Sequence, residues 1–158
     1  MQMMRELALW AALVATAGLP AAMAQSVSAA TSVSGYGLIR LAERGDARAQ
    51  TRLGFMLATG RGAPQNLIES AYWYRRAAEQ GDPDAQYFLG ECYDLGHGVP
   101  VDWILAHKWL NLSAARTQPG DEREHRIRMR DAIASKLSRE QVALAQELAL
   151  AWRPRPER

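Results

Sequence analysis

The stretch that decides the fold is Gly45-Asp46-Ala47-Arg48-Ala49-Gln50, because it recurs 36 positions later as Gly81-Asp82-Pro83-Asp84-Ala85-Gln86. The same offset then holds along most of a repeat, for Leu53-Gly54 and Leu89-Gly90, Gly60 and Gly96, Gly62 and Gly98, Pro64 and Pro100, and Trp73 and Trp109. A period of this length is typical of stacked repeat arrays. Such arrays generally work by presenting a surface to a partner.

Each unit has the pattern of a helix, a loop and a second helix. At 100° per residue from Ala49, the apolar residues Leu53, Met56 and Leu57 lie on one face of a first helix over about 47–59. Gly54 and Gly90 flank this face in mid-helix, where glycine costs up to ~1 kcal/mol relative to alanine. We therefore expect the paired helix to cross at these glycines. The predicted fold is all-α, a short α-solenoid of helix-turn-helix repeats with helical caps.

The ends of these helices carry clear start and stop signals. Asp82 followed by Pro83 is typical of a helix start, and Gly60 and Gly96 are typical of left-handed C-terminal caps. Asn66 and Asp102 are placed to cap the second helices, which carry Trp73 and Trp109 as their expected main apolar contacts.

The array divides into two repeats, 46–80 and 81–115, between capping segments. A short helix over 35–45 is expected to cap the first repeat, and a helical hairpin over 116–153 the second, with a capping box from Ser138 to Gln141. Residues 154–158 form a tail. Two repeats are fewer than the usual three. A structural, self-associating role as a homo-oligomer, or docking onto a longer scaffold, therefore stays open.

The N-terminus has the pattern of a secretory signal peptide over residues 1–24. Leu7–Leu19 is mainly apolar, and Ala22-Met23-Ala24 supplies a small-x-small cleavage site, so we predict a cut after Ala24 and a flexible linker over 25–34. An uncleaved anchor is the alternative, but a helix over the apolar run would span roughly 20 Å of a ~30 Å bilayer core. The expected location is periplasmic or secreted, with no stable membrane span after cleavage.

The repeat residues resemble the Sel1-like repeat family, which is related to the tetratricopeptide repeat. The resemblance covers about 46–115 and rests on Ala49, Leu53, Gly54, Gly60, Gly62, Pro64, Asn66, Ser70, Trp73, Tyr74 and Ala78 and their counterparts in the second unit. Leu57 and Leu110 stand where the family pattern has tyrosine. The resemblance implies a non-catalytic adaptor that assembles proteins in the bacterial envelope. Some cysteine-rich relatives bind or hydrolyse β-lactams, but they carry paired cysteines in every repeat.

Chemistry-bearing patterns do not support an enzyme. Cys92 is the only cysteine, and we expect it to be buried, with His97 in a solvated loop. No catalytic, metal-binding or cofactor-binding spacing occurs, although a small envelope hydrolase stays open as the alternative function. The formal charge of +2 does not favour a nucleic-acid partner. One basic cluster, Arg123, Arg126, Arg128 and Arg130, is interpreted as a solvated helix face, with a phosphate or lipid-headgroup contact as the alternative.

The partner-binding surface is expected on the first helices of the repeats, which line the concave side of tetratricopeptide-like stacks. Opposite the buried face lie the candidate partner-binding residues Thr51, Phe55, Tyr87, Glu91 and Asp94. Phe55 and Tyr87 are the expected anchors for a protein or peptide partner, because aromatic side chains often dominate interfaces. Packing of both rings on the preceding helix is the alternative.

Overall fold

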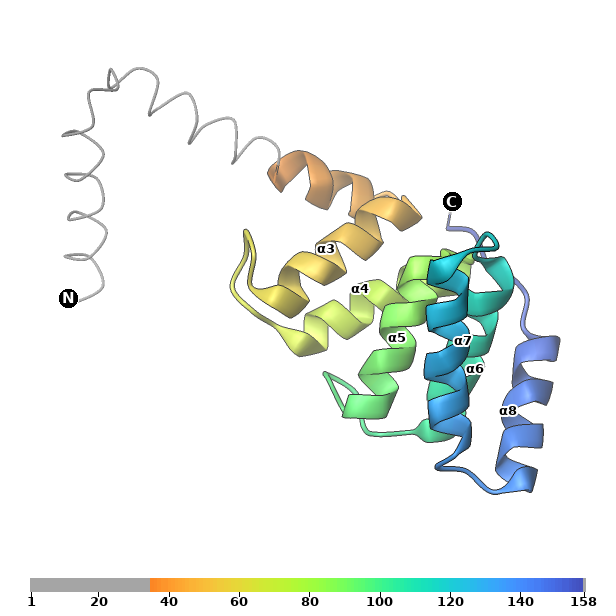
Figure 1. Cartoon of the computed structure of the whole chain (residues 1–158). Coiled ribbons are helices and arrows are strands. Elements are labelled where there is room, and N and C mark those ends of the chain that lie inside the picture. The colour runs from red at the N-terminus through yellow and green to blue at the C-terminus, as the bar shows by residue number, and fades with distance from the viewer. Residues whose placement is uncertain (1–34, 158) are drawn as a thin grey trace, which may run out of the picture. The chain divides into compact units, whose positions relative to one another are not determined.

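The computed structural model describes residues 35–157, which form helices joined by loops and contain no strand (Figure 1). After a helix over residues 35–43 follow α3 (Ala47–Thr59), α4 (Leu67–Gln80), α5 (Pro83–Leu95), α6 (Trp103–Arg116), α7 (Asp121–Ala134) and α8 (Arg139–Ala151). The all-α prediction is confirmed. None of the described helices is long and apolar enough to cross a membrane. The signal peptide and linker expected over 1–34 lie outside the described residues, and the chain from Leu38 onward belongs to one compact unit.

The helices of the two repeats begin where their capping residues predict, and α3 and α5 also end there. Their N-cap side chains accept a backbone N–H three residues further on, and these caps are Asp46, Asn66, Asp82 and Asp102. Replacing such a cap by alanine typically costs about 1 kcal/mol. Gly60 and Gly96 end α3 and α5 at φ values of 70° and 73°, in the left-handed region that favours glycine. The boundaries are therefore set by local sequence.

Each repeat pairs its two helices across the glycine predicted to mark the crossing. A Cβ atom on Gly54 would lie 2.8 Å from the Tyr74 ring of α4, and one on Gly90 would lie 2.8 Å from Leu110 Cγ of α6. The buried Ser70 hydroxyl donates to the Gly54 carbonyl oxygen at 2.8 Å. The prediction is confirmed, since the space that a side chain would need is filled by the partner helix.

The repeated tryptophans pack in two different apolar clusters. Trp73 is buried beside Ala42, Leu53 and Leu57, which joins the helix over 35–43 to the first repeat. Trp109 belongs to the larger cluster, and its ring meets that of Trp152 edge-on at 6.2 Å between centroids. Each tryptophan therefore connects its repeat to a terminal segment.

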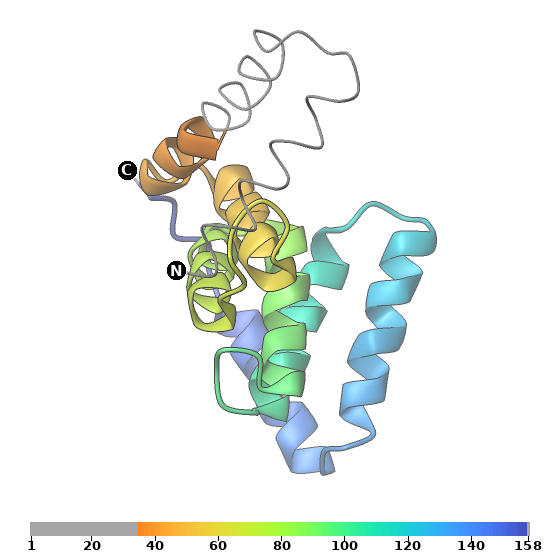
Figure 2. The ribbon, with the colours of Figure 1, turned by 90° about the vertical axis from the view of Figure 1, so that its left-hand side faces the viewer.

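The C-terminal helices differ from the predicted hairpin. Helices α7 and α8 both pack on α6 rather than mainly on each other. Figure 2 shows α7 and α8 apart from each other except near the turn that joins them. The reciprocal capping box of Ser138 and Gln141 is present at the start of α8. Helix α7 ends at Ala134, and residues 135–137 form a turn toward α8.

The basic cluster on α7 corrects the interpretation of a solvated face. Arg126 is only 4% exposed. Its guanidinium donates to the Pro83 carbonyl oxygen and the Ser113 hydroxyl, both at 2.8 Å, and forms ion pairs with Asp84 and Glu122. A buried arginine needs such partners, because an unpaired charge there would be costly. Arg126 therefore fastens α7 to the start of α5 and is not available for a phosphate.

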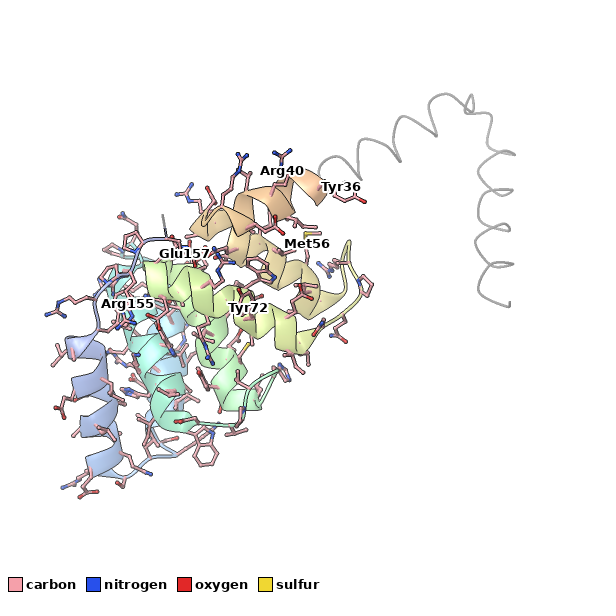
Figure 3. All side chains as sticks on the ribbon, turned by 180° about the vertical axis from the view of Figure 1, so that it is seen from behind. Tyr36, Arg40, Met56, Tyr72, Arg155 and Glu157 are labelled. Atoms are coloured by element: carbon pink, nitrogen blue, oxygen red, sulfur yellow. The ribbon has the colours of Figure 1, made fainter. Side chains whose placement is uncertain are left out.

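The C-terminal tail returns to the first repeat. In Figure 3, Arg155 and Glu157 lie along α4 on the way toward α3. The backbone N–H of Arg155 donates to the Glu79 carbonyl oxygen at 2.8 Å, and the Glu157 carboxylate pairs with Arg76 and accepts from Gln50 at 3.0 Å. Hydrogen bonding from Arg76 lowers the pKa of Glu157. The tail thus ties the end of the fold to its beginning, which the sequence did not predict.

Candidate functional site

The groove along α5 is the main hollow that involves the predicted binding residues. It consists of two adjoining pockets, called here the α5 groove. The first, of about 290 Å³, is lined by Asp84, Tyr87, Phe88, Glu122, His125 and Arg126. The second, of about 220 Å³, is lined by Ala58, Leu67, Ser70, Tyr74, Phe88, Glu91, Cys92, Leu95 and His97. Phe88 lines both pockets, so they adjoin at this side chain of α5.

Aromatic side chains run along this groove from α3 to α7. Phe55 of α3 is 39% exposed, and its ring centroid lies 6.0 Å from that of Phe88. Phe88 stacks on Tyr74 at 5.0 Å and meets Tyr87 edge-on at 5.5 Å. The Tyr87 ring lies 5.8 Å from His125 of α7. Rigid, partly exposed rings of this kind supply contact area with little loss of side-chain freedom.

A polar network fixes Tyr87 within the row. Its hydroxyl donates to Glu91 Oε1 at 2.8 Å and lies 3.1 Å from His125 Nε2. Since the single hydroxyl proton is directed to Glu91, His125 Nε2 carries the proton of the second bond and donates to the tyrosine oxygen. Burial, together with the Glu91 hydrogen bond, raises the pKa of Tyr87 well above its usual range, so this side chain stays neutral.

The structure brings together three of the five predicted binding residues. Phe55, Tyr87 and Glu91 lie at the α5 groove or beside it. The Thr51 hydroxyl lies 2.9 Å from the Ala47 carbonyl oxygen and 3.1 Å from the carboxylate of Asp82, which caps α5, and donates its single proton to one of them. Asp94 forms an ion pair with Lys136 at 2.6 Å. Thr51 and Asp94 therefore hold helices together and do not line the groove.

Other groove residues were missed by the sequence reasoning. Phe88 follows Tyr87 directly, and its position in the first repeat is occupied by Arg52, so the repeat pattern gave no signal for an aromatic ring there. His125 and Glu122 lie on α7, where the period is lost. Only the contact of α7 with the start of α5 brings them to the groove. The aromatic partner of Phe55 is Phe88 of the following repeat.

Cys92 and His97 both line the second pocket, which bears on the hydrolase alternative. Cys92 is buried, as predicted, and His97 is exposed in the loop after α5. Burial raises the pKa of the Cys92 thiol to about 11, with a further contribution from the Glu91 charge. A nucleophilic cysteine acts as a thiolate. At neutral pH this thiol is therefore protonated, and the pair lacks the activation that cysteine catalysis needs. Within residues 35–157 no group of three histidine, cysteine or acidic side chains is placed to hold a metal ion.

Comparison with known proteins identifies the family of the two repeats. The family model of the Sel1 repeat matches residues 47–82 and 83–117. The structure is similar to that of a protective antigen present in uropathogenic Escherichia coli strains, described as displaying an SLR fold, with 31% identity and a TM-score of 0.67 over 73% of this chain. It is also similar to a Sel1 repeat protein from Oxalobacter formigenes, with 43% identity and a TM-score of 0.52 over 58% of this chain.

The two similar structures differ in how much of them this chain spans. It covers 24% of the Escherichia coli antigen and 67% of the Oxalobacter formigenes protein. No curated protein matches the sequence. The helical repeat architecture is thus shared with these relatives.

Proposed function

Since the chain belongs to the Sel1 repeat family, whose members are generally protein-interaction modules, we propose that it is a non-catalytic adaptor that binds a segment of a partner protein in the α5 groove. The observation that carries this proposal is the aromatic row of Phe55, Phe88, Tyr87 and His125, which crosses three helices along one groove. Partly exposed aromatic anchors beside an apolar pocket are the usual basis of peptide recognition.

The proposed setting is the bacterial envelope. Its support is the signal-peptide pattern over residues 1–24, with export after cleavage at Ala24. The protonated Cys92 thiol favours binding over catalysis at the second pocket.

In-cell crosslinking of the tagged full chain tests the adaptor proposal. One sample carries Phe55→Ala and Tyr87→Ala together, which removes two anchors of the row. The matched control is Leu150→Ala, because Leu150 is 77% exposed on α8 and does not line the groove. A specific partner that is lost in the double variant and kept in the control supports the proposal. Crosslinks that involve only a second copy of the chain, or a partner kept in both variants, would overturn it.

A further inference from the structure

The α5 groove is acidic, whereas the chain as a whole has a formal charge of +2. The residues that line its two pockets include three carboxylates, Asp84, Glu91 and Glu122, and one arginine, Arg126, which gives a formal charge of −2 with histidine neutral. The side chains of Asp84 and Glu122 are 57% and 67% exposed, while that of Arg126 is 5% exposed. The negative charge therefore faces the solvent, and the compensating positive charge lies beneath it.

These carboxylates keep hydrogen-bonding capacity for a ligand. Arg126 Nη2 donates to Asp84 Oδ1 and Glu122 Oε1, and the Tyr87 hydroxyl donates to Glu91 Oε1. Among the described residues, the second oxygen of each of these three carboxylates accepts no hydrogen bond. A guanidinium or ammonium group is the ligand chemistry that matches such acceptors, because charge-assisted hydrogen bonds are about twice as strong as neutral ones.

Aromatic and apolar side chains lie beside these carboxylate oxygens and add contact area for a ligand. Tyr87 and Phe88 line the same pocket as Asp84 and Glu122. The Arg126 guanidinium already lies 5.5 Å from the centroid of the Tyr87 ring, so these rings offer a ligand apolar contact and not a free cation-binding face. The second pocket is more apolar, with Leu67, Phe88 and Leu95 on its walls and Glu91 at the junction with the first. A ligand that spans the groove thus meets carboxylates at the α7 end and apolar side chains at the loop end.

We propose that the α5 groove selects a partner segment that carries an arginine or lysine side chain next to an apolar one. The cation binds at the exposed carboxylate oxygens of Asp84 and Glu122, and the apolar side chain enters the pocket formed by Leu67, Phe88 and Leu95. The proposal rests on the proposed adaptor function and adds the chemistry of the partner. An acidic segment is disfavoured, because its carboxylates would meet those of the groove.

Three synthetic peptides test this selectivity against the full chain. They are acetylated Gly-Leu-Arg-Leu-Gly amide, the same peptide with neutral citrulline in place of arginine, and the same peptide with glutamate there. Binding is followed through the backbone amide signals of Tyr87, Phe88 and His125 by NMR titration. We expect the citrulline peptide to bind about tenfold more weakly than the arginine peptide. Binding of the arginine peptide should also weaken as the salt concentration is raised, since salt screens the exposed ion pairs.

Two protein variants test whether the difference in affinity between the arginine and citrulline peptides arises in the groove. Glu122→Gln removes one carboxylate while Asp84 still pairs with Arg126. We expect this variant to bind the arginine peptide with nearly the same affinity as the citrulline peptide. Glu147→Gln is the matched control, since Glu147 is an exposed glutamate on α8 and should not change the ratio. The citrulline comparison needs no variant, so a folding defect cannot obscure the result.

The outcomes separate this proposal from the adaptor function. Equal binding of the arginine and citrulline peptides, or tighter binding of the glutamate peptide, overturns cation selectivity even if the groove signals move. The absence of groove shifts with all three peptides also overturns it. In either case the crosslinking experiment still decides the adaptor function, because it depends on Phe55 and Tyr87 and not on the charge of the partner.

Discussion

Gly90 is the position where the structure makes the sharpest prediction about stability. In an open helix, replacing glycine by alanine stabilises by about 1 kcal/mol. Here the added methyl group would lie 2.8 Å from Leu110 Cγ, 3.1 Å from Leu110 Cδ2 and 3.3 Å from the Ala106 carbonyl oxygen. Leu110 is 1% exposed and has little room to move. Overpacking of about 2 kcal/mol, reduced by the gain of about 1 kcal/mol in helix propensity, leaves a net loss of about 1 kcal/mol for Gly90→Ala.

Urea unfolding followed by circular dichroism and tryptophan fluorescence measures this loss. The expected value corresponds to a fall of about 4 °C in the melting temperature of a unit of this size. Gly37→Ala is the matched control, because Gly37 is also helical and exposed, and a Cβ atom there would meet nothing within 4 Å. We expect the control to keep or slightly raise stability.

A double-mutant cycle attributes the loss to Leu110. In a Leu110→Ala background the clashing atoms are gone, so Gly90→Ala should become neutral or stabilising, which gives a coupling energy of about 1 kcal/mol or more. If Gly90→Ala stabilises the otherwise unchanged chain, or costs the same in both backgrounds, α5 and α6 do not cross closely at Gly90, and the argument from the glycines fails.

Three further predictions concern the tail, a buried histidine and the arginine of α7. Glu157→Gln should lower the free energy of unfolding by about 1 kcal/mol at pH 7. Because Arg76 lowers the pKa of Glu157, this contribution is present above the unfolded value of about 4.3 and is lost as the pH falls through the lower folded pKa. The urea midpoints of the variant and the parent should therefore converge in acid, with Glu147→Gln as the control. Burial, and secondarily Arg130, lowers the pKa of His107, so the stability of the protein should fall as the pH drops below about 6.5. In the variant His107→Leu the melting temperature should depend less on pH between 7 and 5. A pH dependence that is retained in this variant but lost in His97→Gln would contradict the assignment to His107. Arg126→Met should cost about 2 kcal/mol in urea unfolding, because it removes bonds to Pro83, Ser113, Asp84 and Glu122, whereas the exposed Arg128→Met should be nearly neutral; equal effects would refute the fastening role.

Local sequence determined much of this protein. The 36-residue period and the caps at Asp46, Asn66, Asp82 and Asp102 predicted where α3–α6 begin, and the left-handed glycines predicted where α3 and α5 end, because helix ends are specified by residues within one turn. The mid-helix glycines also predicted the crossing points. A small residue repeated where it costs helix propensity indicates the close approach of another helix.

The tertiary structure alone decided the composition of the α5 groove and the path of the tail. Arg126 could not be recognised as buried from the sequence, because its partners Pro83 and Asp84 lie more than forty positions away and α7 follows no repeat. The same is true of Glu157, which meets Gln50 and Arg76 across the whole array. Periodicity describes how a repeat contacts its neighbour. Contacts between segments that share no period depend on which charged and apolar surfaces the folded repeats leave uncovered, and only the assembled structure specifies those surfaces.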